Sequence, residues 1–278
     1  MLDAGRIALE HFTEPQTEHK PDNSLVTVAD HAVEEFLTQK LVRDEPQDRT
    51  VTLVGEETVG VADEETIHAT LNGVTWVVDP IDGTASYANK LPTWGVSLGR
   101  LEDGRFTDGA LFLPRTGDLF ITDGSDVLYE ENPRDPGRWR FEALKALNIP
   151  ERPYNPMGML SFPHEIAYGG RYTGSNPFQA NGSAVYSMAQ LILGGYLAYV
   201  ARIKLWDVAG SIPLLQRLGF LVQYPDGHLL GDSVTERDWV LEPGNHRIWR
   251  SRGTWMIARN RDTLEHLRDH YHSAGEEW

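Results

Sequence analysis

The spacing of apolar residues predicts a chain whose first half is rich in strands. Apolar positions at helical spacing predict a helix over residues 2–12 and a second helix that begins near Asp30. Short apolar runs bounded by turn residues then predict strands, at 51–54, 94–101, 109–114 and 119–122. Because these strands follow one another without long helices between them, they predict an antiparallel meander rather than alternating β-α-β units.

From residue 141 onwards, predicted strands alternate with predicted helices. The pattern favours strands at 157–162 and 196–203, helices at 182–193, 207–218 and 261–270, and paired strands within 245–257. The segment 130–140 is rich in charge and proline, which is typical of a linker between domains. We therefore expect an N-terminal α+β domain over residues 1–138 and a C-terminal α/β domain over residues 139–278.

Composition and charge narrow the classes of function. The 278 residues are 40% hydrophobic, which is enough for a full core, and carry a formal net charge of −16. That charge argues against a nucleic-acid backbone or an anionic membrane as a partner. The absence of cysteine excludes disulfides, thiolate catalysis and zinc–thiolate sites. No apolar run approaches the ~18 residues that span a membrane, and the N-terminus lacks a signal-peptide core, so we expect a cytoplasmic location.

The stretch from Thr75 to Thr84 contains the strongest candidate chemistry. Its apolar residues predict a buried strand that stops near Pro80, since proline cannot donate to a sheet ladder. Asp79 and Asp82 follow three residues apart across a turn, and carboxylate pairs of this kind suit Mg²⁺. Backbone N–H groups of the following Gly83-Thr84 step could hold an anion. The alternative is an Asx-rich turn that merely caps a helix.

Two further segments strengthen the interpretation of Asp79 and Asp82. Gly55-Glu56-Glu57 follows a predicted strand, and Trp206-Asp207-Val208-Ala209-Gly210 precedes an apolar helical pattern. Alone, the first is usually a solvated turn and the second a helix N-cap. The order GEE, DPIDGT, WDxAG resembles the inositol monophosphatase family, from about Asp22 to Gly219. That resemblance implies a five-layer α-β-α-β-α sandwich, and the predicted meander and α/β units are compatible with it. The resemblance also implies that the protein is a metal-dependent phosphoric monoester hydrolase.

The resemblance also implies a cluster of two to three Mg²⁺ ions. Separate parts of the chain would supply its metal-binding residues: Glu56, Glu57, Asp79, Asp82 and Asp207 through side chains and Ile81 through its carbonyl oxygen. Asp79 would bridge the first two ions. Glu57, together with Asp30, would reach a looser third ion mostly through water.

Catalytic and substrate-binding residues follow from the same resemblance. Thr84, paired with Asp30, would orient the attacking water, and Glu56 would act beside them. The backbone of Gly83 and Thr84 would hold the phosphate, and Ser183 would line the pocket. Simpler structural roles remain open for each of these: Asp30 as a helix N-cap, Thr84 as the cap of the next helix, and Ser183 as the start of a helix. Lys20 is expected to be a solvated loop residue.

The substrate pocket departs from the inositol type in two places. Members of that type usually carry an arginine before the Gly-Ser step and a glutamate before the Trp-Asp motif. Here the corresponding segments are Gln179-Ala180-Asn181 and Arg202-Ile203-Lys204-Leu205. Arg202 and Lys204 would suit a second anionic group, although exposed cations on a strand are the more common explanation.

These observations lead to a function hypothesis with open alternatives. We expect Mg²⁺-dependent hydrolysis of a small phosphate monoester, inositol monophosphatase-like, in a cytoplasmic homodimer. Arg202 is the candidate for substrate selection. The alternatives are a bisphosphate (fructose 1,6-bisphosphate or 3′-phosphoadenosine 5′-phosphate), histidinol phosphate, and a metal-binding relative without turnover.

Overall fold

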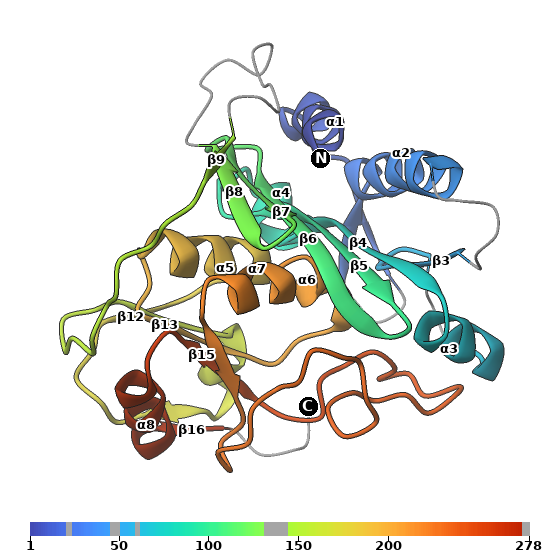
Figure 1. The fold of residues 1–278 in the computed structure, drawn as a ribbon. Coiled ribbons are helices and arrows are strands. Elements are labelled where there is room, and N and C mark those ends of the chain that lie inside the picture. Colours follow the sequence, from blue (N-terminus) through green and yellow to red (C-terminus); the bar gives the residue numbers. More distant parts are fainter. Residues whose placement is uncertain (21–23, 45–50, 59–61, 131–143, 274–278) are drawn as a thin grey trace.

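Two β-sheets organise the protein, as the computed structural model shows (Figure 1). The structure describes residues 1–20, 24–44, 51–58, 62–130 and 144–273. The larger sheet has seven strands in the order β3-β4-β5-β6-β7-β8-β9, and the smaller has five in the order β12-β10-β13-β15-β14. Two short antiparallel pairs lie apart from them: β1 (Thr17–His19) with β2 (Leu25–Thr27), and β11 (Arg171–Tyr172) with β16 (Tyr271–His272).

The seven-stranded sheet is antiparallel except at one edge, where β3 runs parallel to β4. Its strands are β3 (Val51–Gly55), β4 (Val74–Asp82), β5 (Gly95–Glu102), β6 (Arg105–Leu113), β7 (Asp118–Asp123), β8 (Asp126–Glu130) and β9 (Lys145–Ala146). The meander from β5 to β8 confirms the antiparallel arrangement predicted from the sequence. In β4 nearly every residue is buried, as expected for a strand whose two faces are both covered.

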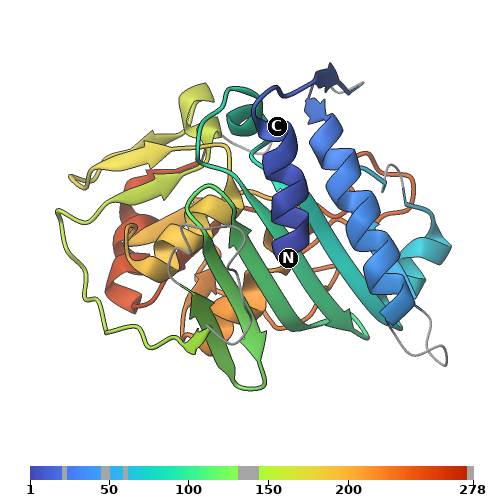
Figure 2. The ribbon, with the colours of Figure 1, turned by 90° about the horizontal axis from the view of Figure 1, so that it is seen from above.

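Helices cover both faces of this sheet. On one face lie α1 (Leu2–Phe12) and α2 (Val28–Asp44), side by side (Figure 2). Ala4, Ala8 and Phe12 recur every four residues along α1, so one face of that helix is buried against the sheet. The other face is covered by α5 (Ala184–Leu193), α6 (Leu205–Ala209) and α7 (Ile212–Arg217). Two further helices, α3 (Glu64–Leu71) and α4 (Thr84–Ala88), lie near β3 and β2 respectively.

The five-stranded sheet completes the layering. Its strands are β12 (Phe178–Ala180), β10 (Leu160–Phe162), β13 (Ala198–Ala201), β15 (Trp255–Ala258) and β14 (Leu221–Gln223). Alternate residues of β13 face opposite sides: Tyr199 packs towards the middle helices, and Val200 packs towards α8 (Arg261–His270). The order of layers is therefore helix, sheet, helix, sheet, helix. The five-layer sandwich expected from the sequence is confirmed.

Three local predictions were wrong, each for an identifiable reason. Strand β4 continues through Pro80, because its pairing with β5 shifts register between Asp79 and Asp82 and needs no ladder donor there. The predicted helix over 207–218 is two helices, α6 and α7, separated at Gly210. The segment 245–257 contains strand β15 only from Trp255 onwards, and otherwise makes isolated bridges. A short 3₁₀ helix, η3 (His164–Tyr168), was not predicted.

Two further expectations concern the chain as a whole. Within the described ranges, no helix combines the length and the apolar character that crossing a membrane requires. The domain boundary at 138/139 and all of the predicted linker except Glu130, the last residue of β8, lie in the segment 131–143, which is outside the described residues.

Candidate active site

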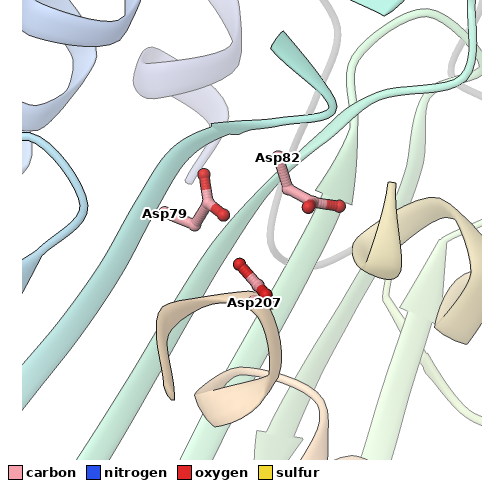
Figure 3. A group of neighbouring side chains, drawn as sticks. All are labelled: Asp79, Asp82 and Asp207. Carbon is pink, nitrogen blue, oxygen red and sulfur yellow. The ribbon is translucent and has the colours of Figure 1, made fainter. Parts of the chain in front are cut away.

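Three aspartates from two elements meet beside the end of β4. Asp79 and Asp82 flank the register shift of that strand, and Asp207 comes from α6 on the neighbouring layer. Their carboxylates face a common space (Figure 3). One oxygen atom of each lies within 4.8 Å of the others. The register shift of β4 and the position of α6 therefore bring together acids that are separated by more than a hundred residues in the sequence.

Glycines in the sheet determine how closely α6 approaches. Gly99 of β5 and Gly109 of β6 are directly paired, and together they leave a notch in the sheet surface. A Cβ atom on Gly99 would lie 2.4 Å from the carbonyl carbon of Ala209, and one on Gly109 would lie 2.1 Å from the carbonyl oxygen of Gly210. The backbone of α6 thus rests on the backbone of the sheet, and this contact places Asp207.

Asp82 is held by the start of α5. The Ser183 hydroxyl donates a hydrogen bond to Asp82 Oδ2, and the Val185 backbone N–H donates to the same oxygen at 2.6 Å. Ser183 is also the N-cap of α5, because its side chain accepts from Tyr186 N at 3.0 Å. A Cβ atom on Gly83, whose φ is 91°, would lie 2.9 Å from Ser183 Cβ. The Gly-Ser step therefore both begins a helix and touches the acidic cluster.

The cluster holds like charges in a low-dielectric environment. Burial raises the pKa of Asp82 to about 8, with the negative charge of Asp207 adding to the effect and the bonds from Ser183 and Val185 opposing it. Burial, followed by the charges of Glu56 and Asp82, raises the pKa of Asp79 well above its ordinary value. Burial raises the pKa of Asp207 to about 6 and outweighs the opposite effect of the Lys204 backbone N–H, which donates to Asp207 Oδ2 at 2.7 Å.

The Gly-Glu-Glu turn carries Glu56 and Glu57 to the edge of the cluster. Lys20 Nζ lies 2.8 Å from Glu57 Oε1 and 3.4 Å from Glu56 Oε1, so the expectation of a solvated lysine was wrong. Burial alone would lower the pKa of Lys20, but the charges of Glu56 and Glu57 outweigh burial and raise it. The negative charge of Glu56 also acts on the aspartates, because it contributes to the raised pKa values of Asp79 and Asp207.

Glu34, from α2, contacts this turn and was missed by the sequence analysis. It is 2% exposed, and its Oε2 accepts from Glu57 N at 3.0 Å. Its carboxylate lies against Gly55, where a Cβ atom would come within 2.5 Å of it. Burial raises the pKa of Glu34. The available signal was an acid on the apolar face of a helix, next to Val33 and one turn beyond Asp30.

Thr84 and Asp30 form a second polar group beside the cluster. Thr84 Oγ1 lies 3.3 Å from Asp30 Oδ1 and 3.0 Å from the carbonyl oxygen of Ile81. Gly83, not Thr84, is the N-cap of α4, so the simpler role considered for Thr84 does not apply. Asp30 accepts from the backbone and hydroxyl of Thr27, and burial raises its pKa to about 7. Asp30 lies within the first turn of α2 and is fully buried.

The residues of the Arg202–Lys204 segment lie where β13 ends. Arg202 and Lys204 are half-buried, whereas Ile203 between them is buried in the core. Lys204 Nζ lies 5.0 Å from the centre of the Trp206 ring, which is close enough for a cation–π contact. Asn181, which stands near the position of the missing arginine, accepts from Ser183 N at 3.0 Å through its Oδ1. It therefore closes a local turn just before the N-cap of α5.

The cluster fits a divalent cation. Asp79 Oδ1 is buried and has no hydrogen-bond partner among the described residues. Three carboxylates this close repel one another, and a hard cation removes that repulsion while it binds to the orphaned oxygen. All the sequence-predicted site residues except Arg202 thus lie on or beside a single acidic centre, while Arg202 lies on the segment that leads to it.

Comparison with known proteins places this centre in context. The family model "Inositol monophosphatase family" matches residues 2–261. A histidinol-phosphatase of Chlorobaculum parvum is 26% identical over 78% of this chain and 79% of its own length. An inositol-1-monophosphatase of Bacillus subtilis is 28% identical over 73% of each chain. Among solved structures, an IMPase/NADP phosphatase complexed with NADP and Ca²⁺ superposes with a TM-score of 0.70 at 16% identity, covering 98% of this chain and 94% of that one.

Proposed function

The chain belongs to the inositol monophosphatase family, whose members are metal-dependent phosphatases, and we propose on this premise that it hydrolyses small phosphate monoesters with Mg²⁺. The observation that carries the proposal is the group of three aspartate oxygens within 4.8 Å of one another, one of them buried without a partner. Such a group is unfavourable in a protein that binds no cation.

The proposed ligands divide between the two halves of the chain. Two to three Mg²⁺ ions would be held by the residues named from the family pattern: Glu56, Glu57, Asp79, Asp82, Asp207 and the carbonyl of Ile81. Bound Mg²⁺ would neutralise charge on the phosphate, lower the pKa of water and stabilise the leaving oxygen. The hydrogen bonds from Ser183 and Val185 leave Asp82 Oδ1 available while they fix the orientation of the carboxylate.

The protein's own part in the reaction is to orient the attacking water and to accept a proton from it. Thr84 Oγ1 can donate its single hydrogen to Asp30 and accept one from the attacking water. A carboxylate whose pKa lies near neutrality, as for Asp30, is suited to receive a proton at physiological pH. Glu56 would assist from the other side of the cluster. The backbone N–H groups of Gly83 and Thr84 would hold the phosphate.

The choice of substrate is a finer proposal. The lack of an acid between β13 and Asp207 leaves no partner there for inositol hydroxyls, so inositol 1-phosphate should be a modest substrate. Arg202 favours a second anionic group, as in fructose 1,6-bisphosphate or 3′-phosphoadenosine 5′-phosphate. A solved relative that binds NADP, which carries several phosphates, supports this direction. Histidinol phosphate is the alternative that the Chlorobaculum parvum relative supports. The homodimer and the cytoplasmic location stay predictions.

A phosphate-release screen tests the proposal. Purified protein is assayed against about twenty small phosphomonoesters with Mg²⁺, with EDTA, and with EDTA followed by excess Mg²⁺. We expect turnover that EDTA abolishes and Mg²⁺ restores, and an Asp82→Asn variant that folds but loses most of its activity. Undiminished turnover in excess chelator would rule out the metal centre. A lack of turnover with every ester would favour a metal-binding relative without catalysis.

A further inference from the structure

Two histidines lie one turn apart on α8, the helix that covers the outer face of the five-stranded sheet (Figure 1). His266 and His270 are four residues apart, a spacing that brings two side chains onto the same face of a helix. Their ring centres are 4.5 Å apart, and both side chains are half-buried. The five-stranded sheet separates them from α6, which carries Asp207, so this pair lies apart from the acidic centre.

Hydrogen bonds determine which nitrogen of His266 carries a proton. The amide of Asn176 has a fixed orientation, because its Nδ2 donates to the carbonyl oxygens of Asn155 and Gly158 at 2.8 and 2.9 Å. Its Oδ1 can only accept, and it takes the single hydrogen of the Tyr172 hydroxyl, 3.1 Å away. The Tyr172 oxygen then accepts from His266 Nε2 at 2.8 Å. In the neutral ring, the lone pair is therefore on Nδ1 of His266, which has no hydrogen-bond partner among the described residues.

A second hydroxyl orients His270 in the same way. Thr173 Oγ1 lies 3.3 Å from the carbonyl oxygen of His270, which can only accept, and 3.1 Å from Nδ1 of that residue. The single hydrogen of Thr173 goes to the carbonyl, so Nδ1 of His270 donates and Nε2 carries the lone pair. Tyr172 belongs to β11 and Thr173 follows it, so one short segment engages the N–H groups of both rings. Histidine ligands of metals are held in this way, with one nitrogen bonded to a neighbour and the other left for the ion.

The spacing of the two rings and the charge around them suit a transition-metal ion. Two histidines four residues apart on one helix are a known arrangement for Zn²⁺. When two imidazoles bind one ion at about 2.0–2.1 Å, their ring centres lie roughly 4.5–5 Å apart, and the observed 4.5 Å agrees with this. The exposed acids Glu265 and Asp269 directly precede the two histidines, and the chain carries a net charge of −16, so the surroundings attract cations. Imidazole ligands favour Zn²⁺, Cu²⁺ and Ni²⁺, whereas the oxygen ligands of the acidic centre favour Mg²⁺.

We propose that His266 and His270 bind one transition-metal ion, with Zn²⁺ as the favoured occupant, on the outer layer of the protein. Water completes the coordination of the ion. Because the same rings are bonded to Tyr172 and Thr173, the ion fastens α8 to β11 and stabilises this layer. The site lies beyond the proposed phosphatase function and does not depend on it, since it involves neither the acidic centre nor a substrate.

Cu²⁺ is a suitable probe, because bound imidazole nitrogens give an electron paramagnetic resonance pattern that carboxylate oxygens do not give. The full chain is studied in excess Mg²⁺, which competes for the acidic centre, with less than one equivalent of Cu²⁺. We expect coupling to two nitrogens in the wild type and in the control His246→Gln, which removes an exposed histidine from another segment. His266→Gln and His270→Gln should each lose this signal. Calorimetry in excess Mg²⁺ should show that the affinity for Zn²⁺ falls at least about tenfold in these two variants and is unchanged in the control.

The wild-type protein alone can overturn this inference. A Cu²⁺ signal with one nitrogen, or with oxygen ligands only, would do so without any variant. Equal Zn²⁺ affinity in the wild type and in either His266→Gln or His270→Gln would also overturn it, as would an equal loss in His246→Gln, which would indicate scattered binding to surface histidines. Zn²⁺ should raise the Tm of the wild type more than that of either variant, because the ion binds the folded arrangement. A chain that hydrolyses no ester would refute the proposed function and leave this site standing.

Discussion

Replacing Asp207 by Asn should stabilise the metal-free protein while it removes activity. The amide can still accept the hydrogen bond from Lys204 N, so the start of α6 keeps its contact. It carries no charge, so the repulsion within the cluster is reduced. The wild-type carboxyl has a pKa of about 6 in the fold, raised from 3.8, and burial is the main cause. The size and sign of the effect follow from that shift.

A raised pKa means that the folded protein holds a proton which the unfolded chain has released. Stability contributed by this proton is therefore present at low pH and is lost as the pH rises from about 4 through 6. At pH 7.5 the ionised Asp207 destabilises the metal-free fold by up to about 3 kcal/mol, at about 1.4 kcal/mol per pKa unit. The cost falls to roughly half of this at pH 5 and becomes small near pH 4 by the same linkage.

Thermal unfolding in EDTA measures this difference. For a chain of 278 residues, the entropy of unfolding is roughly 0.6 kcal/mol per degree, so 3 kcal/mol corresponds to a Tm higher by about 5 °C. Asp207→Asn should exceed the wild type by up to this amount at pH 7.5 and approach it near pH 4. The exposed Asp123→Asn serves as a control that should show neither effect. Added Mg²⁺ should raise the Tm of the wild type more than that of the variant.

Two results would refute this reasoning. In the first, Asp207→Asn would be less stable than the wild type in EDTA at pH 7.5, and Asp207 would then contribute packing or hydrogen bonding that outweighs its charge. In the second, the Tm difference would be the same at pH 4 and pH 7.5, and the ionised Asp207 would then carry none of the cost inferred from its burial and from its negatively charged neighbours.

Two other variants test how the centre is held. Gly109→Ala should force α6 off the sheet, cost about 1–3 kcal/mol from overpacking and lower kcat/KM. Gly231→Ala is the control: its Cβ would meet Ser233 N only at 4.0 Å, so unfolding and kinetic assays should show no change. Glu34→Ala should raise the Mg²⁺ concentration needed for half-maximal activity several-fold, because Glu57 N loses its hydrogen-bond partner. Glu34→Gln can still accept that bond and should stay near the wild type. Equal Mg²⁺ requirements in the two Glu34 variants would contradict this role.

Much of the architecture was predictable because local pattern and tertiary environment agree. The helix over 2–12 and the final helix over 261–270 have the predicted bounds, since both carry a single apolar stripe. Asp79, Asp82 and Asp207 could be named in advance because their motifs are short and ordered. The sequence could not show that they converge, because that depends on the register shift in β4 and on glycines of other strands. Nor does any local signal reveal that Lys204, just before α6, pairs with Arg250 in an isolated antiparallel bridge.

The notch formed by Gly99 and Gly109 also bears on how such a protein can diverge. The height of Asp207 above the large sheet is set by contact between two backbones, so it does not depend on which side chains fill the rest of the core. The segment of 31 residues between Gln223 and Trp255, in contrast, contains no helix or strand, and backbone atoms of Trp249 and Ser251 bond it to Leu205 and Ile203. Side chains of that segment can therefore be exchanged while these backbone contacts, and with them the position of Asp207, are kept. Relatives could thus differ in the surface beside the reactive centre and inherit its geometry unchanged.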